Sequence, residues 1–562
     1  MSTLLTLHDP QTTRERYAVG VWTTDTLYGL LSRHAHERGQ AWALRDAHQR
    51  LTWAELLDAV DRVAGALHQA GLRLGDRVSV WLPNRVEAVI VLLACARNGY
   101  VCNPSLHQNY TVEEIAVLLE RIQCKALFAQ VGWGADVDRA DVFARARQLP
   151  GIKRVFALHH PKQPGHLPEG CEPFPTATVK PPPANTDPDK IVYLAFTSGT
   201  TGLPKGVMHS DNTLLANARA MVEDWHHDHS MVLLSLSPFS HHIFTVALDQ
   251  TLVTGGELAM NDPTAGIPVI DWIAQTGATY VMGVPTHAID LLAVVKQRGL
   301  TSLGKVRTFY LAGAPIPSEV ANRLLALGAK PQNVYGMTEN GSHQYTLPGD
   351  DVQTITSTCG KACKAYEIKL WSQENPDVEV ARGEVGEIGG RGGCLMLGYF
   401  ANQAATENSF NTSGWFMSGD LGRFDERGNL QVVGRAKDLI IRGGHNIHPA
   451  RIEELALRHP GIAKAAAFAI ADDRLGEKVC LAIIPAAAAP SAEEVLQHLF
   501  DTGLSKFDMP EFFLVQAAFP LTASGKILKR ELTQWAKAGK IVPQPVRWKA
   551  EKSATPEGVQ NT

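Results

Sequence analysis

The sequence predicts an α/β protein with a large N-terminal domain of layered sheets and helices and a smaller α+β C-terminal domain. Short apolar runs of strand length alternate with helix-length segments through most of the chain, which is typical of parallel sheets covered by helices. The proline-rich residues 181–188 indicate a stiff linker before the next strand. Composition changes again near Gly434, and the roughly 110 residues that follow have the size of a small domain. We expect the N-terminal domain over 1–433 and the C-terminal domain over 438–562, joined by residues 434–437.

Two helices of the N-terminal domain are marked by their first residues. Residues 52–55 and 111–114 both read Thr-x-x-Glu, the capping box that opens an amphipathic helix. Gly71 is expected to end the first of them. Residues 90–96 are apolar on every side, which favours a buried helix over a strand. The apolar stripe of the first helix consists of Leu56, Val60, Val63 and Leu67.

Apolar runs of four to six residues, separated by helix-length segments, predict the buried strands. In the N-terminal domain these runs are 78–82, 191–196, 232–236, 280–284, 308–311 and 333–335. The C-terminal domain mixes both elements, with predicted strands at 465–470 and 479–484 and predicted helices at 450–458 and 492–500.

Composition excludes several classes of protein. Of 562 residues, 45% are hydrophobic and 20% are charged, with a net charge of −4. A nucleic-acid-binding protein would carry a basic face instead. The eight cysteines form no CxxC pair, so neither a zinc ribbon nor a disulfide framework is indicated. The apolar stretch 88–96 is far shorter than the ~20 residues of a membrane span, and the N-terminus lacks a signal peptide. We expect a cytoplasmic protein; a homodimer is an open alternative to the monomer.

One loop has the composition of a polyphosphate site. It follows the apolar strand at 191–196, where ligands of parallel α/β sheets bind. Hydroxyls, glycines that let backbone N–H groups approach, and one lysine suit a phosphate chain. Pro204 and Gly206 stand where a Walker A loop needs Gly and Ser or Thr, so this is a different motif. The loop reads Thr197-Ser198-Gly199-Thr200-Thr201-Gly202-Leu203-Pro204-Lys205-Gly206.

With this loop and further motifs in order between about residues 26 and 532, the chain resembles the adenylate-forming superfamily of acyl-CoA synthetases, adenylation domains and luciferases. The resemblance implies that Thr338 holds the α-phosphate and that Glu339 binds Mg²⁺, a cation that takes oxygen ligands. Asp420 and Arg435 would bind the ribose. The other residues that the resemblance assigns to the nucleotide or to coenzyme A are Thr197 to Gly202, Lys205, Gly313, Ala314, Tyr335, Gly336, Gly443 and Gly444.

The resemblance also implies a catalytic lysine, a hinge over 434–437 and a mobile C-terminal domain that rotates. Lys526, in the motif 522–526, would bridge the carboxylate and the α-phosphate. Lys437 stands at the hinge position, about which the C-terminal domain would turn to bring Gly443 and Gly444 to the site. Taken alone, these lysines have a second interpretation as solvated surface residues, and Asp420 as a turn residue after Gly419.

The acyl pocket is the least determined part of the site. His241 matches a family position that gates the carboxylate; we interpret it as a gate and hydrogen-bond donor, with a core histidine as the alternative. Small, moderately polar walls favour a compact acid over a long fatty chain, and the string 206–215 resembles ligases of cyclic and aromatic acids. Residues 226–229 hold three histidines and are interpreted as a solvated helix end. The predicted pocket residues are Phe239, His241, Met282, Thr286 and Asn340.

These motifs predict an ATP-dependent acid–thiol ligase that forms an acyl-adenylate, releases pyrophosphate and then makes an acyl-CoA thioester. The expected substrate is a small-to-medium, cyclic or aromatic, carboxylic acid, and the expected cofactors are ATP, Mg²⁺ and coenzyme A. One alternative is a stand-alone enzyme that loads a carrier-protein phosphopantetheine. The other is a non-catalytic acyl-AMP-binding relic, which predicts broken motifs.

Overall fold

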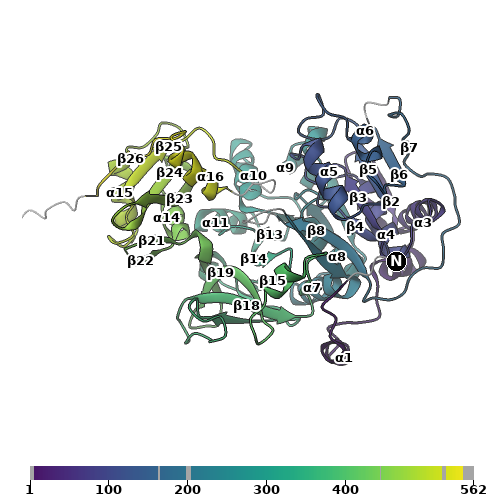
Figure 1. Cartoon of the computed structure of the whole chain (residues 1–562), viewed down its shortest axis with the longest axis horizontal. Helices are drawn as coiled ribbons and strands as arrows, with labels where there is room; N and C mark the ends of the chain where they lie inside the picture. Colours follow the sequence, from purple (N-terminus) through teal and green to yellow (C-terminus); the bar gives the residue numbers. More distant parts are fainter. Residues whose placement is uncertain (1–4, 162–164, 198–203, 444, 522–526, 549–562) are drawn as a thin grey trace, which may run out of the picture. The chain divides into compact units, whose positions relative to one another are not determined.

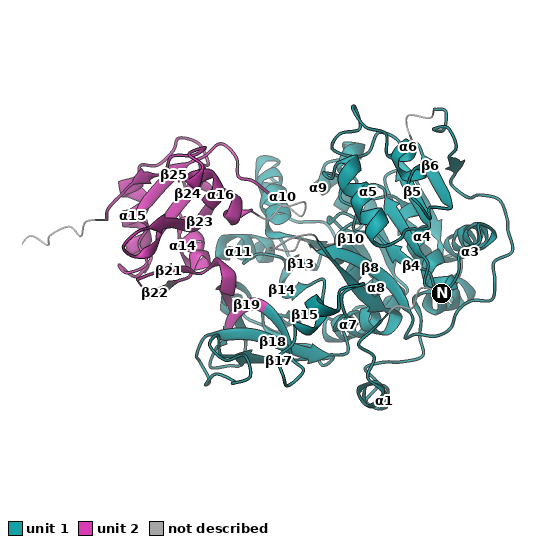
Figure 2. Ribbon diagram, viewed as in Figure 1, with its two compact units in different colours: residues 1–418, 423–431 teal, residues 419–422, 432–562 magenta. Residues whose placement is uncertain are grey.

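The computed structural model describes residues 5–161, 165–197, 204–443, 445–521 and 527–548 (Figure 1). The chain forms two compact units (Figure 2). The first comprises Met1–Ser418 and Arg423–Gln431, and the second comprises Gly419–Gly422 and Val432–Thr562. The predicted α/β class, with a larger N-terminal and a smaller C-terminal part, is confirmed.

The largest sheet of the first unit runs in the order β16-β15-β14-β13-β12-β10-β11-β1-β2. Neighbours from β14 to β1 are parallel, and β15, β16 and β2 are antiparallel additions at the edges. Its strands are β1 (Trp42–Arg45), β2 (Arg50–Thr52), β10 (Val232–Ser235), β11 (Glu257–Met260), β12 (Tyr280–Gly283), β13 (Thr308–Ala312), β14 (Lys330–Met337), β15 (Gly341–Tyr345) and β16 (Lys361–Ala362).

A second sheet runs in the order β7-β6-β5-β3-β4-β8-β9. Only its last pair is antiparallel: β8 and β9 form a hairpin in which Thr197 pairs with Lys205. The predicted phosphate loop therefore connects two strands of one hairpin, and its residues Ser198, Gly199, Thr200, Thr201 and Gly202 lie outside the described residues. The strands are β3 (Arg77–Trp81), β4 (Val101–Asn103), β5 (Ala126–Gln130), β6 (Arg154–Leu158), β7 (Glu172–Pro173), β8 (Ile191–Thr197) and β9 (Lys205–Ser210).

The three helices that the sequence predicts in this unit, at Thr52, at Thr111 and over residues 90–96, are present. Both capping boxes are present, at Thr52 and at Thr111. The stripe predicted for the first helix is buried, and Gly71 follows its end with φ of 78°. Val86–Asn98 is a helix buried on nearly all sides. The helices are α1 (Pro10–Ala18), α2 (Leu27–Arg38), α3 (Trp53–Gln69), α4 (Val86–Asn98), α5 (Val112–Arg121), α6 (Val142–Arg147), α7 (Asp211–Asp224), α8 (His242–Thr254), α9 (Val269–Thr276), α10 (Pro285–Gln297), α11 (Ser318–Ala326), α12 (Val352–Ser357) and α13 (Gln403–Glu407).

Three apolar cores show how the layers stack. The largest core holds α2, α3, α4, α7 and α8 together with side chains of both sheets, so these helices lie between the sheets. A second core packs α5 and α6 on the other face of the β3–β9 sheet. A third packs α9, α10 and α11 on the other face of the β10–β16 sheet. Burial of both sheets on both faces explains why their strands read as continuous apolar runs.

A smaller sheet, in the order β17-β18-β19-β20, contains the three crossings of the chain between the units. Its strands are β17 (Tyr366–Trp371), β18 (Gly386–Gly392), β19 (Phe416–Phe424) and β20 (Leu430–Arg435).

The second unit is an α+β sheet with helices on both faces. The long hairpin β23–β24 is its centre, with α14 and α15 in one core and α16 in the other. Across the described ranges of both units, no helix is long and apolar enough to cross a membrane. The elements are β21 (Ile440–Arg442), β22 (His445–Ile447), β23 (Ile462–Asp472), β24 (Gly476–Pro485), β25 (Phe512–Val515), β26 (Gln544–Pro545), α14 (Pro449–Ala456), α15 (Ala492–Asp501) and α16 (Lys529–Lys537).

Candidate active site

The predicted adenine-and-metal segment forms the end of β14 and the tight turn into β15. Tyr335 and Thr338 are half-buried and Gly336 is exposed, whereas Glu339 is only 8% exposed. A Cβ at Gly336 would stand 1.8 Å from the carbonyl oxygen of Gly341, so the turn accepts no side chain there. The local fold thus presents Thr338 and encloses Glu339.

Glu339 is held from two sides by the segment that follows β18. The Tyr399 hydroxyl donates to Glu339 Oε1 at 2.9 Å, and the backbone N–H of Met396 donates to the Glu339 carbonyl at 2.6 Å. Burial, with the adjacent Glu339 carboxylate second, raises the pKa of Tyr399, so this phenol remains a donor at neutral pH. The Glu339 carboxylate is therefore kept in one orientation.

The same tyrosine reaches the lysine of the phosphate loop. Lys205 Nζ lies 4.2 Å from the centroid of the Tyr399 ring, within the range of a cation–π contact. The backbone N–H of Phe400 donates to the Gly206 carbonyl at 2.7 Å. Thr197, opposite Lys205 on the hairpin, donates from Oγ1 to the Lys205 carbonyl at 3.5 Å. One ring thus connects the cation of the loop with the predicted metal ligand.

Glu339 fits a metal ion that arrives with its nucleotide. No group of three or more His, Cys, Asp or Glu side chains that could hold an ion occurs within the ranges that the structure describes. Mg²⁺ in nucleotide sites commonly takes one or two carboxylates and completes its shell with phosphate oxygens and water. A single oriented carboxylate near a phosphate loop matches that donor set.

A histidine braces the backbone of Thr338. His209 Nε2 is 2.7 Å from the Thr338 carbonyl, which can only accept, so Nε2 carries the proton. Its Nδ1 is 3.0 Å from Thr213 Oγ1. Burial lowers the pKa of His209 to about 4, so the ring is neutral at physiological pH. Sequence reasoning missed this residue, because a lone histidine in a strand gives no sign of its partner.

The predicted gate lies at the start of α8. His241 precedes the helix and packs edge-on against His107, with ring centroids 4.8 Å apart. His107 Nδ1 is 2.8 Å from Ser240 Oγ, and burial lowers the pKa of His107 to about 4. The predicted gate residue His241 therefore packs against a neutral imidazole.

The other predicted pocket residues differ in exposure. Phe239 and Met282 are buried in the core between the two sheets, and Thr286 is exposed on α10. Asn340 is buried: its Oδ1 accepts from Met337 N at 3.0 Å and its Nδ2 donates to Tyr366 Oη at 3.3 Å. The contribution of these four to an acyl pocket stays a prediction.

Gly313 and Ala314 are exposed immediately after β13, where a ligand at the strand ends would lie. Gly313 has φ of 89°, in the left-handed region that favours glycine.

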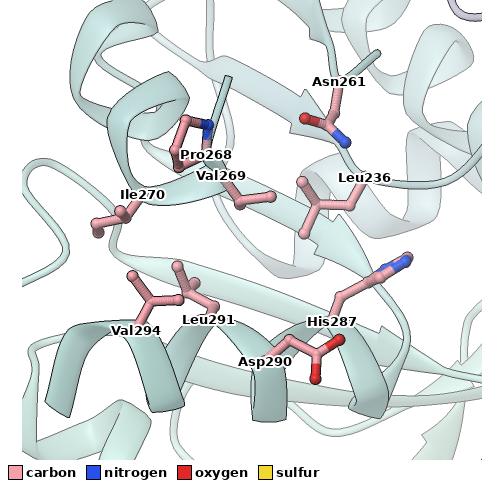
Figure 3. A pocket seen from close by; sticks show the side chains of 9 residues that line it. All are labelled: Leu236, Asn261, Pro268, Val269, Ile270, His287, Asp290, Leu291 and Val294. Atoms are coloured by element: carbon pink, nitrogen blue, oxygen red, sulfur yellow. The ribbon is translucent and has the colours of Figure 1, made fainter. Parts of the chain in front are cut away.

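A crevice of about 190 Å³ lies between α9 and α10 (Figure 3). Ile270, Leu291 and Val294 lie toward one end of the crevice, and Leu236, Asn261 and His287 lie toward the other (Figure 3). His287 Nδ1 accepts from the Val284 N–H at 3.3 Å, which fixes the start of α10. α9 and α10 pack on the face of this sheet that lies opposite to α7 and α8.

The second unit carries the predicted ribose pair. Arg435 Nε lies 3.1 Å from Asp420 Oδ1, with the Asp420 side chain 9% exposed. Lys437 lies in the short 3₁₀ turn Ala436–Asp438 that follows β20. Gly443 has φ of 58° and donates its N–H to the Leu475 carbonyl at 2.8 Å. Gly444 and Lys526 lie outside the described residues.

In the first unit, an enclosed glutamate and a loop lysine at the strand ends have the chemistry that a metal-bound nucleotide needs, and the second unit carries its own Asp420–Arg435 pair. The chain belongs to the AMP-binding enzyme family. Residues 31–400 match the family described as "AMP-binding enzyme", and residues 451–526 match the one described as "AMP-binding enzyme C-terminal domain". The resemblance to adenylate-forming enzymes is thereby confirmed, and so is the predicted activity of an acyl-adenylate-forming ligase of the acyl-CoA synthetase type.

Individual relatives cover nearly the whole chain. A medium-chain fatty-acid–CoA ligase of Escherichia coli (strain K12) is 28% identical over 91% of this chain and 90% of its own length. A salicyl-AMP ligase / salicyl-S-ArCP synthetase of Mycobacterium tuberculosis is 31% identical over 92% of both chains. Among solved structures, ATP-bound MatB from Rhodopseudomonas palustris is 28% identical, with a TM-score of 0.78 over 91% of this chain and 99% of that one.

Proposed function

We propose that this protein activates a small-to-medium carboxylic acid with MgATP and transfers the acyl group to the thiol of coenzyme A. A cyclic or aromatic acid is the proposed substrate class, because the string 206–215 resembles ligases of such acids. The observation that carries the proposal is the connected set Lys205, Tyr399 and Glu339, which places a cation and an oriented carboxylate beside Thr338. That set suits a metal-bound triphosphate.

In the first step a carboxylate oxygen bonds to the α-phosphorus, and the bond from that phosphorus to the pyrophosphate oxygen breaks. Pyrophosphate leaves with the electron pair. Two anions must approach in line, so catalysis is positional and electrostatic. Lys205 and the loop hydroxyls would neutralise the departing phosphates, Thr338 would orient the α-phosphate, and Lys526 would stabilise the charge between the two reactants. A bound Mg²⁺ would supply further charge neutralisation at Glu339.

In the second step the acceptor sulfur bonds to the acyl carbon, and the carbon–oxygen bond to AMP breaks. AMP leaves as an anion and the thiol proton passes to solvent. The thiol needs the place that Lys526 occupies in the first step, so we infer that the C-terminal unit turns at Lys437 and that Gly443 and Gly444 then border the pantetheine arm. Location in the cytoplasm and assembly as a homodimer stay predictions.

A carrier-protein thiol is the second candidate acceptor. It is favoured by the relative named for both salicyl-AMP and salicyl-S-ArCP synthesis, while the Escherichia coli relative is named for CoA ligation. A CoA-thioester assay with each acid decides between the two, because adenylation is common to both. A non-catalytic relic predicts broken motifs, and Lys205, Glu339, Asp420 and Arg435 stand in place.

The test is a pair of half-reactions with Lys526→Ala. We expect acid-dependent ATP–pyrophosphate exchange to fall by at least ~100-fold, while thioester formation from supplied acyl-adenylate is retained. Lys537→Ala, which changes an exposed lysine of α16, is the matched control and should leave exchange unchanged. Equal loss of both half-reactions in Lys526→Ala would contradict the rotating-unit account.

A further inference from the structure

A strap formed by residues 5–22 lies against the segment 393–400 that holds Glu339. Trp22, at the end of the strap, donates from Nε1 to the Gly393 carbonyl at 2.8 Å. Gly393 is buried, and Trp22 is 1% exposed. Because a buried carbonyl needs a donor, the indole N–H helps to fix the start of this segment.

The start of the strap bonds to the middle of the same segment. Leu397 donates its N–H to the Met208 carbonyl of β9 at 2.9 Å, whereas its own carbonyl accepts from the Leu7 N–H at 3.1 Å. In a regular strand the two groups of one residue face the same neighbour, so the backbone turns over here. Gly398, the next residue, has φ of 105°, in the left-handed region that favours glycine. The segment is therefore clamped between β9 on one side and the strap on the other.

Neighbours within the strap hold the Trp22 ring in place. The Arg16 guanidinium carbon lies 4.6 Å from the ring centroid, and the Tyr17 ring meets the indole edge-on with centroids 6.0 Å apart. A Cβ at Gly393 would stand 2.3 Å from Val21 Cγ1, so the strap and the segment pack without room for a side chain there. A shift of the strap is thus passed directly to the backbone of the segment.

The same segment contacts Glu339 twice. The Met396 N–H donates to the Glu339 carbonyl at 2.6 Å, and the Tyr399 hydroxyl donates to Glu339 Oε1 at 2.9 Å. If Trp22 loses its N–H, the buried Gly393 carbonyl is left unpaired, which is costly, and the backbone moves toward another donor. That movement changes the position of the two groups that orient the carboxylate.

We propose that Trp22 is a positioning residue for the metal-bound nucleotide. Its indole N–H, together with the Leu7 N–H, sets the position of segment 393–400 and thereby the orientation of the Glu339 carboxylate. Trp22 is buried, so it acts through the segment rather than by contact with the reacting groups. The inference rests on the proposed function, because it assumes that Glu339 receives the metal ion that arrives with ATP.

Trp22→Phe keeps an aromatic ring and removes the N–H. We expect the Mg²⁺ concentration for half-maximal ATP–pyrophosphate exchange to rise roughly three- to fivefold, and Mn²⁺ binding to the ATP-bound protein, followed by electron paramagnetic resonance, to weaken by a similar factor. Amide hydrogen exchange in segment 393–400, measured by mass spectrometry without nucleotide, should become faster. Trp272→Phe is the matched control, because Trp272 Nε1 also donates to the carbonyl of a buried residue, Met260, at 3.1 Å, but from α9; it should change none of the three.

A second variant tests the strap without changing the core. Leu7→Pro removes the backbone N–H that bonds to Leu397, while the Leu7 side chain is already 44% exposed. We expect a roughly two- to threefold rise in the same Mg²⁺ and Mn²⁺ values. Leu5→Pro is its matched control, because Leu5 is 77% exposed and its N–H makes no hydrogen bond to the residues that the structure describes. This pair decides the question if Trp22→Phe does not fold.

The double variant Trp22→Phe/Tyr399→Phe shows whether both residues act on Glu339. We expect the combined change in Mn²⁺ affinity to be smaller than the product of the two single changes, because the two residues act on one carboxylate. Full multiplication of the effects, or an unchanged Mn²⁺ affinity in folded Trp22→Phe or Leu7→Pro, would overturn the proposal. Failure of the proposed function has a different signature, because then no acid stimulates exchange in the wild-type protein at all.

Discussion

Tyr399→Phe removes one hydroxyl and tests whether the orientation of Glu339 matters for the metal-bound nucleotide. The hydroxyl donates to Glu339 Oε1 at 2.9 Å, and the carboxylate is 8% exposed. The phenyl ring remains, so the contact with Lys205 and the packing of the segment are kept. The variant therefore isolates a single charge-assisted hydrogen bond.

The size of the effect follows from that bond. A hydrogen bond to a charged group contributes about 1.5–3 kcal/mol, and about 1.4 kcal/mol corresponds to a tenfold change in an equilibrium constant. Glu339 has further interactions, so we expect the lower end of this range. The Mg²⁺ concentration for half-maximal exchange should rise about tenfold, while the maximal rate at saturating Mg²⁺ changes less.

Two assays check this expectation. Exchange is measured as a function of Mg²⁺ at constant ATP, and Mn²⁺ binding to the ATP-bound protein is followed by electron paramagnetic resonance, which does not depend on turnover. Tyr28→Phe is the control, because Tyr28 also donates to a carboxylate, Asp61 Oδ1, at 2.9 Å but lies on α2. An unchanged Mg²⁺ and Mn²⁺ dependence in Tyr399→Phe would refute the role assigned to this tyrosine.

Three further predictions concern stability and nucleotide binding. Lys190→Met should lower the free energy of unfolding by about 3–5 kcal/mol in urea titrations, because it leaves Asp211, fully buried and paired with Lys190 at 2.5 Å, without its cation; a loss below about 1 kcal/mol would contradict this. His209, with its pKa lowered to about 4, should make the protein labile to acid. Its contribution to stability is complete above the unfolded pKa near 6.5 and is lost as the pH falls toward 4, and the loss amounts to about 2 kcal/mol at pH 5. His209→Gln should therefore flatten the pH dependence of the free energy of unfolding, and an equally steep curve would count against a buried neutral ring. Arg435→Met should raise the Kd for ATP roughly tenfold in calorimetry, since it removes the partner of Asp420; an unaltered Kd would argue against the ribose pair.

Much of the fold could be predicted because local signals and tertiary packing agree. The capping boxes at Thr52 and Thr111 start helices as expected, and the run at 191–196 is a strand. The predicted strands of the C-terminal domain lie within β23 and β24. The chain crosses between units at Ser418–Gly419, returns at Gly422–Arg423 and crosses again at Gln431–Val432. No change in composition marks the first of these crossings, because β19 continues through it.

The candidate site was predicted where residues close in sequence form one motif, and not where partners come from distant segments. Thr338 and Glu339 stand out in one string, but Tyr399, 60 residues away, gives no signal of its hydrogen bond to Glu339. The same holds for His209 with Thr338 and for Trp22 with Gly393, since only folding brings those pairs together.

The histidine cluster at 226–229 shows where composition misleads. His226 and His229 are exposed as expected of a solvated helix end, but the interpretation is wrong for His227. Its ring stacks on Tyr280 with centroids 4.6 Å apart, and burial lowers its pKa to about 4. One position in a polar run can still face the core, because α7 ends there and the chain turns back toward β10.

The fate of oxygen in the reaction tests the central claim most directly. An acid that supports exchange is labelled with ¹⁸O in its carboxyl group and converted with MgATP and coenzyme A. The ¹⁸O content of AMP and of pyrophosphate is then measured by mass spectrometry. Attack of the carboxylate on the α-phosphorus predicts one labelled oxygen in AMP and none in pyrophosphate. Label in inorganic phosphate or pyrophosphate, with AMP unlabelled, would contradict adenylation at this site.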